Sequence, residues 1–152
     1  SLGYDLEGWD LTSQWERDNP VAACEAARAI ADGASVRLVV GTTIPFGKNY
    51  GPGMAQTAHE YVQQGKAFQA NISDLAEYRR QYAAILEPII AAAPNTRIWM
   101  DLGTNPKGTG AVTAEDLMQR VEVMRDLVNG VWLTQNNDAE AGIVDAFLEL
   151  LR

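Results

Sequence analysis

Strand-like runs alternate with helix-like runs along the chain, and this alternation constrains the fold more than any other feature of the sequence. A helical pattern follows each strand-like run, which favours a parallel sheet joined by crossover helices. When strands follow one another in order, right-handed crossovers place every helix on the same side of the sheet. The predicted strands are Leu2–Glu7, Val36–Gly41, Ala67–Ile72, Arg97–Leu102 and Gly130–Thr134. We therefore expect an α/β fold of about five βα units.

The length of the chain sets the scale of this fold. The sequence has 152 residues, which suits a single domain spanning residues 1–152. A complete (β/α)8 barrel, or TIM barrel, usually needs about 250 residues. We therefore expect the C-terminal part of a truncated barrel, with the remainder of the barrel missing from this chain. Because a partial barrel leaves open strand edges, we expect the isolated chain to be marginally stable or to associate.

Two segments rich in glycine and proline follow predicted strands. They are Ile44–Gln56 and Gly103–Val112. In a barrel, the loops that follow strands lie at the carboxyl ends of the strands, where active sites form. We expect both segments to be long loops that shape a ligand cleft.

Polar side chains share one face of the predicted strands. Asp5 and Glu7 oppose the apolar residues of the first strand, because side chains alternate along a strand. Gln69 and Asn71 do so in the third. The fourth and fifth strands add Asp101 and Trp132 to the same face. Because burying such groups without partners is costly, we expect them to line a solvated cleft together. An open sheet with one solvated face is the alternative.

Composition narrows the range of partners. The net charge of −8, from 12 Lys and Arg against 20 Asp and Glu, disfavours nucleic acids and anionic membranes. The lone Cys24 excludes an intramolecular disulfide and is expected to be a buried small residue of a helix. The lone His59 is expected on the surface of a helix start. No ligand spacing demands a metal ion, and we expect no cofactor.

Asp5 and Glu7 carry the strongest chemical signal in the sequence. Two residues apart on a strand, they lie on one face with Cα atoms roughly 6–7 Å apart. Close carboxylates raise each other's proton affinity, so one can hold a proton while the other stays ionised. Cleavage of a glycosidic bond requires such a protonated general acid.

Several motifs, in order, resemble known barrel proteins. The run Tyr4-Asp5-Leu6-Glu7 resembles the end of the fourth-strand Asp-x-Asp-x-Glu signature of family-18 chitinases and related barrels, and also a group of uncharacterised bacterial barrel proteins. Gly103-Thr104-Asn105-Pro106 and Gly130-Val131-Trp132-Leu133 resemble the seventh and eighth strand ends of that group. The resemblance implies strands 4 to 8 of a TIM barrel, a secreted or extracellular location, and a glycosidase that acts on an oligosaccharide or polysaccharide.

The resemblance also implies roles for individual residues. Glu7 would protonate the glycosidic oxygen, and Asp5 would orient the substrate or tune Glu7. Trp132 would form an aromatic floor under the sugar. The further expected substrate-binding residues are Asn71, Gln69, Asp101, Trp9 and Asn105.

Two departures from the chitinase pattern keep other functions open. Gly3 replaces the first Asp of the signature, and Asn71-Ile72-Ser73-Asp74 replaces a sixth-strand segment that contains Tyr. A plain hydrolase that uses water or a nucleophile fits these departures, as does a non-catalytic carbohydrate- or protein-binding barrel. A metal-assisted lyase or an aldolase is a third class, disfavoured because no predicted strand carries a suitable Lys.

Overall fold

The computed structural model describes residues 1–8 and 10–152. Strands and helices alternate along them, as the sequence predicts. The strands are β1 (Leu2–Leu6), β2 (Leu38–Thr42), β3 (Glu60–Gln64), β4 (Arg97–Gly103) and β5 (Gly130–Thr134). The helices are α1 (Gln14–Asp18), α2 (Pro20–Gly33), α3 (Ile44–Thr57), α4 (Lys66–Asn71), α5 (Leu75–Ala92), α6 (Ala114–Met124) and α7 (Ala141–Leu150), with short 3₁₀ turns η1 (Pro106–Gly108) and η2 (Asp138–Glu140).

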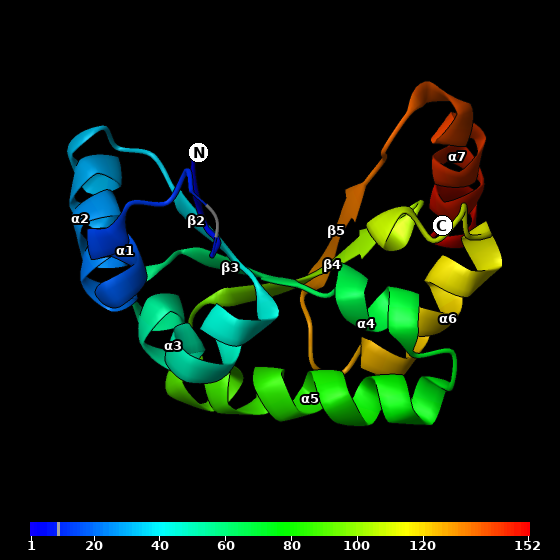
Figure 1. Cartoon of the computed structure of the whole chain (residues 1–152), viewed down its shortest axis with the longest axis horizontal. Helices are drawn as coiled ribbons and strands as arrows, with labels where there is room; N and C mark the ends of the chain where they lie inside the picture. Colours follow the sequence, from blue (N-terminus) through cyan, green and yellow to red (C-terminus); the bar gives the residue numbers. More distant parts are fainter. Residues whose placement is uncertain (9) are drawn as a thin grey trace.

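The five strands form one parallel sheet in the order β1-β2-β3-β4-β5. Figure 1 shows the sheet curving through an arc, with α2, α3, α5, α6 and α7 arranged around its outer side. Sequential parallel strands with all their helices on one side are the arrangement of a (β/α)8 barrel. The expected partial barrel of five βα units is confirmed.

The core lies between the outer face of the sheet and the helices. Alternate residues of the strands point into it, whereas the residues between them face the inner side. The core-facing residues are almost completely buried in β2, β3 and β4, but in β1 only Leu6 is, and those of β5 are partly buried. The buried strand residues are Leu6, Leu38, Val40, Tyr61, Ile98, Met100 and Leu102. From the helices, α2 contributes small residues, including the predicted buried Cys24, and α5 contributes Tyr78, Tyr82, Leu86 and Ile89. Each large apolar side chain buried in this way stabilises the fold by roughly 1.5–3 kcal/mol.

The third predicted strand is wrong. Ala67–Ile72 lies over helix α4, and the strand is instead Glu60–Gln64. Phe68 and Ala70 alternate with polar residues as in a strand, but they belong to the short helix α4, which buries Phe68 and Gln69. Real strand β3 is difficult to recognise because three consecutive residues, Tyr61 to Gln63, are buried and one of them is polar.

The expected loop at Ile44–Gln56 is also wrong, because this segment is helix α3. Its glycines serve close packing rather than a turn. A Cβ atom at Gly47 would stand 1.9 Å from the Gln63 side chain, and one at Gly51 would stand 2.6 Å from Ile89. Glycine at these positions lets α3 lie against β3 and α5. The segment Gly103–Val112 does form a connection, with the turn η1 inside it.

Candidate functional site

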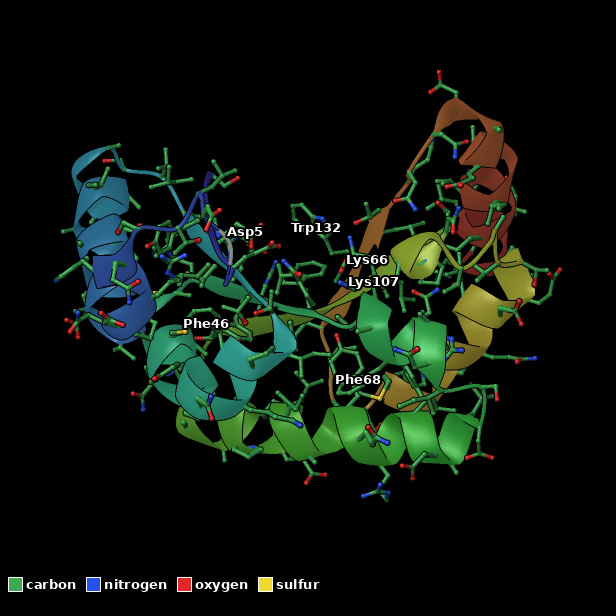
Figure 2. All side chains as sticks on the ribbon, viewed as in Figure 1. Asp5, Phe46, Lys66, Phe68, Lys107 and Trp132 are labelled. Atoms are coloured by element: carbon green, nitrogen blue, oxygen red, sulfur yellow. The ribbon has the colours of Figure 1, made fainter. Side chains whose placement is uncertain are left out.

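A pocket of about 430 Å³ opens on the inner face of the sheet, near the carboxyl ends of its strands. All five strands and the start of α4 contribute to its wall. Figure 2 shows Asp5 on the β1 side, with Trp132 and Lys66 across from it. The lining residues are Gly3, Tyr4, Asp5, Glu7, Val39, Gly41, Val62, Gln64, Lys66, Asp101, Trp132 and Thr134. The pocket therefore brings together residues that lie up to 131 positions apart in the sequence, from Gly3 to Thr134.

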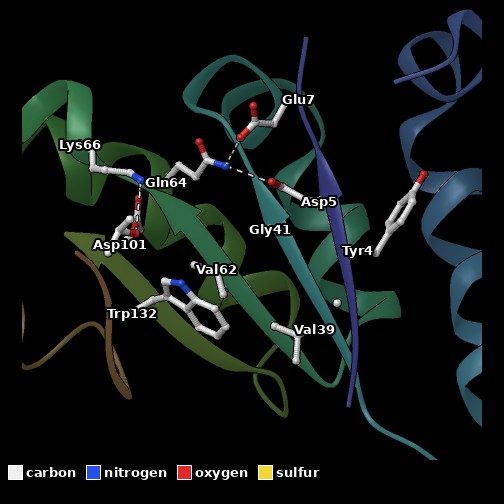
Figure 3. Close-up of a pocket in the computed structure, with 12 residues that line it drawn as sticks. Tyr4, Asp5, Glu7, Val39, Gly41, Val62, Gln64, Lys66, Asp101 and Trp132 are labelled. Carbon is white, nitrogen blue, oxygen red and sulfur yellow. Dashed lines mark hydrogen bonds and ion pairs between the residues drawn. The ribbon is translucent and has the colours of Figure 1, made fainter. Parts of the chain in front are cut away.

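Asp5 and Glu7 lie together on one side of the pocket, as the sequence predicts. The side-chain amide of Gln64 donates to both, from Nε2 to Asp5 Oδ1 at 3.2 Å and to Glu7 Oε1 at 2.6 Å (Figure 3). Gly41, the partner of Asp5 on β2, makes room for this cluster. A Cβ atom there would stand 3.0 Å from Asp5 Oδ1, closer than almost all real contacts.

This environment increases the proton affinity of Asp5. Burial raises the pKa of its carboxyl from 3.8 to about 6, and the neighbouring Glu7 carboxylate adds to the rise. The hydrogen bond from Gln64 and the more distant Lys66 act in the opposite direction. Around pH 6, a proton therefore occupies the Asp5 carboxyl in a substantial fraction of the molecules.

A second polar cluster lies at the ends of β4 and β5. Asp101 Oδ1 accepts from the Thr134 hydroxyl at 3.1 Å, and Lys66 Nζ stands 3.6 Å from Asp101 Oδ2. Lys66 also donates to the Thr134 hydroxyl at 3.3 Å. Burial raises the pKa of Asp101 from 3.8 to about 6, although Lys66 and Thr134 favour the ionised carboxylate. The prediction that Asp101 faces the same cleft as Asp5 and Glu7 is confirmed.

Trp132 supplies the aromatic surface of the pocket. It is the register partner of Asp101 on the neighbouring strand, and Figure 3 shows it next to Val62 and Val39. It remains 54% exposed, which is unusual for an indole that belongs to a sheet. Trp132 therefore offers an open apolar face beside the carboxylates, as expected from the sequence.

Three other predicted binding residues do not line this pocket, namely Gln69, Asn71 and Asn105. Gln69 lies on α4, where its amide exchanges two hydrogen bonds of 2.9 Å with the backbone of Gly103. Asn71 lies on the same helix and donates to the Ala67 carbonyl, so neither residue faces the cleft from a strand. Asn105 accepts from the Gly110 N–H in the connection after β4. The predicted site at Trp9 falls outside the described residues.

Gln64 and Lys66 were not predicted as site residues because the third strand was misplaced. Gln64 ends β3, and Lys66 comes two residues later, so both reach the carboxyl edge of the sheet. The run Glu60–Gln64, followed by Gly65, was the signal that could have located them. The sequence argument against a lyase or aldolase relied on the absence of a strand-borne Lys. The position of Lys66 removes that argument.

His59 lies just before β3, not at a helix start as expected. Its Nδ1 accepts a hydrogen bond from the Leu38 N–H at 2.9 Å, so it joins the beginnings of β2 and β3. This end of the sheet is opposite the pocket.

Residues 1–8 and 10–152 contain no group of three or more His, Cys, Asp or Glu side chains arranged to hold a metal ion. Within the same ranges, none of the helices has the length and apolar character that crossing a membrane requires.

The chain was compared with protein families and with curated proteins. No family model matches it, and no curated protein matches it significantly. The geometry of the pocket therefore carries the functional argument.

Proposed function

We propose that this protein cleaves glycosidic bonds by acid/base catalysis at the pocket on the inner face of its sheet. The observation that carries the proposal is the Asp5–Glu7 pair, held by one Gln64 amide beside the exposed indole of Trp132. A glycosidase needs a carboxyl group that keeps a proton near neutral pH, and a surface that binds the apolar face of a sugar ring. This pocket supplies both.

In this proposal the pair acts as one acid. Asp5 holds the proton in the empty site, because its surroundings raise its pKa to about 6. Glu7 follows the end of β1 and accepts the shorter hydrogen bond from Gln64. As the bond from the anomeric carbon to the glycosidic oxygen breaks, Glu7 relays the Asp5 proton to that oxygen. Water then bonds to the anomeric carbon and returns a proton to the pair. The role expected for Glu7 from the sequence is thus kept, with Asp5 as the proton reserve.

The pair does not fit the two opposed carboxylates of an inverting enzyme, which stand about 6.5–9.5 Å apart with a water between them. Here both carboxylates accept from the same nitrogen atom, so they lie side by side. A base or nucleophile must therefore come from elsewhere. Asp101, the other Asp that lines the pocket, is the candidate, and Lys66 favours its ionised form.

A second candidate function is glycan binding without catalysis. The observation that favours it is the extent of hydrogen bonding within the pocket, where Gln64 and Thr134 already donate to the carboxylates. Well-ordered carboxylates of this kind can also accept from sugar hydroxyls. The two functions share the pocket and differ only in whether a bond is broken.

A panel of chromogenic glycosides, tested on the wild type and on Glu7→Gln, separates the two functions. Loss of a general acid is expected to reduce kcat by about 100- to 10,000-fold. Glu115→Gln, an exposed substitution on α6, is the matched control and should retain full activity. Circular dichroism and thermal melting verify that each variant is folded. Sugar binding by a wild type that releases no product would support the binding module instead.

A further inference from the structure

The carboxylates of the pocket have few cationic partners. Asp5 and Glu7 share one neutral donor, Gln64, and the ion pairs found among residues 1–8 and 10–152 do not include either of them. Lys66 is the only ammonium group among the lining residues, and it pairs with Asp101. Above pH 6, where Asp5 and Asp101 are mostly ionised, three carboxylates face one cation and the pocket bears an excess of negative charge.

Asp101 is the carboxylate of the pocket that has a cationic partner. Its side chain is only 4% exposed, and its Oδ2 atom accepts no hydrogen bond from the described part of the protein. The Lys66 ammonium, at 3.6 Å, is beyond normal hydrogen-bonding distance. Lys66 is nevertheless the cation that compensates Asp101, which leaves the more exposed Asp5 and Glu7 carboxylates for a cationic ligand.

The aromatic wall suits a cation as well. Cations are attracted to the face of an indole, which is the most favourable aromatic side chain for this contact. Trp132 presents such a face in the same pocket as Asp5, Glu7 and Asp101. By contrast, a separate small cavity of about 130 Å³ beyond Gln64 is lined by Lys66 and Lys107 and would repel a cation. A positive group is therefore directed to the side of Asp5, Glu7 and Trp132.

We infer that the sugar bound here carries a free ammonium group, so that the ligand is an oligosaccharide of amino sugars without N-acetyl groups. This inference rests on the proposed function and names the substrate class of the same site. An ammonium group has three N–H donors and one positive charge, which match the excess of carboxylate oxygens. A neutral sugar leaves that charge uncompensated, and an acidic sugar is repelled by it.

Isothermal titration calorimetry with three tetrasaccharides of glucose units tests the inference, with one unmodified, one fully N-acetylated and one bearing free amines. The free-amine tetrasaccharide is expected to bind at least tenfold more tightly than the other two. Its advantage should shrink as salt rises from 0.05 to 0.5 M, by roughly the screening expected for partly exposed charges. Asp5→Asn and Asp101→Asn should each reduce the advantage. Asp145→Asn, which removes an exposed charge on α7, should leave it unchanged.

The outcomes distinguish this inference from the proposed function, because chromatography of the titrated samples reports cleavage separately from binding. Equal affinity for the three tetrasaccharides, or binding of none, would overturn the inference, even if a glycoside is hydrolysed. Tight, salt-sensitive binding of the free-amine sugar without cleavage would support the inference and contradict the hydrolase. The comparison of sugars and the salt series use the wild type, so a variant that fails to fold does not remove the test.

Discussion

The two faces of the sheet differ in how favourable the surroundings of their side chains are. On the outer face, Leu38, Met100 and Leu102 are fully buried against helices. On the inner face, Asp5 and Asp101 have raised pKa values, and Trp132 remains half exposed. The same strands therefore stabilise the fold on one side and hold groups that burial destabilises on the other. Such strained electrostatics cluster at functional sites, whereas apolar packing alone would serve stability.

Truncating one side chain on each face of the sheet should change the free energy of unfolding very differently. This difference is the largest effect that we expect. Leu102→Ala leaves a cavity in the outer core and should lower the free energy of unfolding by about 2–5 kcal/mol. Trp132→Ala should change it by less than about 1 kcal/mol, because its side chain is already half exposed. Urea denaturation measures both. Comparable losses from the two substitutions would show that the inner face is also part of the core.

The pH dependence of the free energy of unfolding should show that the ionised Asp101 carboxylate on the inner face destabilises the folded protein. The folded protein raises the pKa of Asp101 from 3.8 to about 6, so between these values the folded state binds more protons than the unfolded state. The unfolding free energy should therefore fall as pH rises from 4 to 7, with about 2–3 kcal/mol of the decrease due to Asp101. Asp101→Asn removes this part of the decrease. Identical pH profiles for the wild type and the variant would contradict the assignment.

A smaller and more local effect is expected at Gly41. A Cβ atom there would press on Asp5 Oδ1 at 3.0 Å, so Gly41→Ala should displace the carboxylate from Gln64. We expect weaker ligand binding and a change in stability of less than about 1 kcal/mol. Gly33→Ala, at the end of α2 and outside the pocket, is the control because a Cβ atom there meets nothing within 4 Å. Equal effects of the two substitutions on binding would mean that contact with Asp5 is unimportant.

The features of the fold and site that depend on local sequence pattern were predicted well. Alternation identified β1, β4 and β5, and with them Asp5, Glu7, Asp101 and Trp132 on one face. Two helix starts are also recognisable in the sequence, since Asp74 and Thr113 each stand three residues before an acidic residue whose backbone N–H they accept a capping hydrogen bond from. These features depend on local pattern, which a single sequence records.

The missed features depend on contacts between distant segments. Gly47 and Gly51 read as loop residues, and only their closeness to Gln63 and Ile89 explains why a helix needs them. Gln63 is buried in β3 because Tyr61 and the Thr42 carbonyl provide its hydrogen-bond partners. A buried polar strand of this kind lacks the expected alternation. Its neighbours Gln64 and Lys66 were therefore missed.

Titration of the Asp5 carboxyl carbon by NMR, in the wild type and in Glu7→Gln, tests most directly the claim that burial and the Glu7 carboxylate raise the pKa of Asp5. The wild type should show a pKa of about 6. In Glu7→Gln the pKa should fall, because the charge of Glu7 is lost, but it should stay above 3.8 because the burial remains. A pKa near 3.8 in the wild type that does not change in Glu7→Gln would contradict the claim.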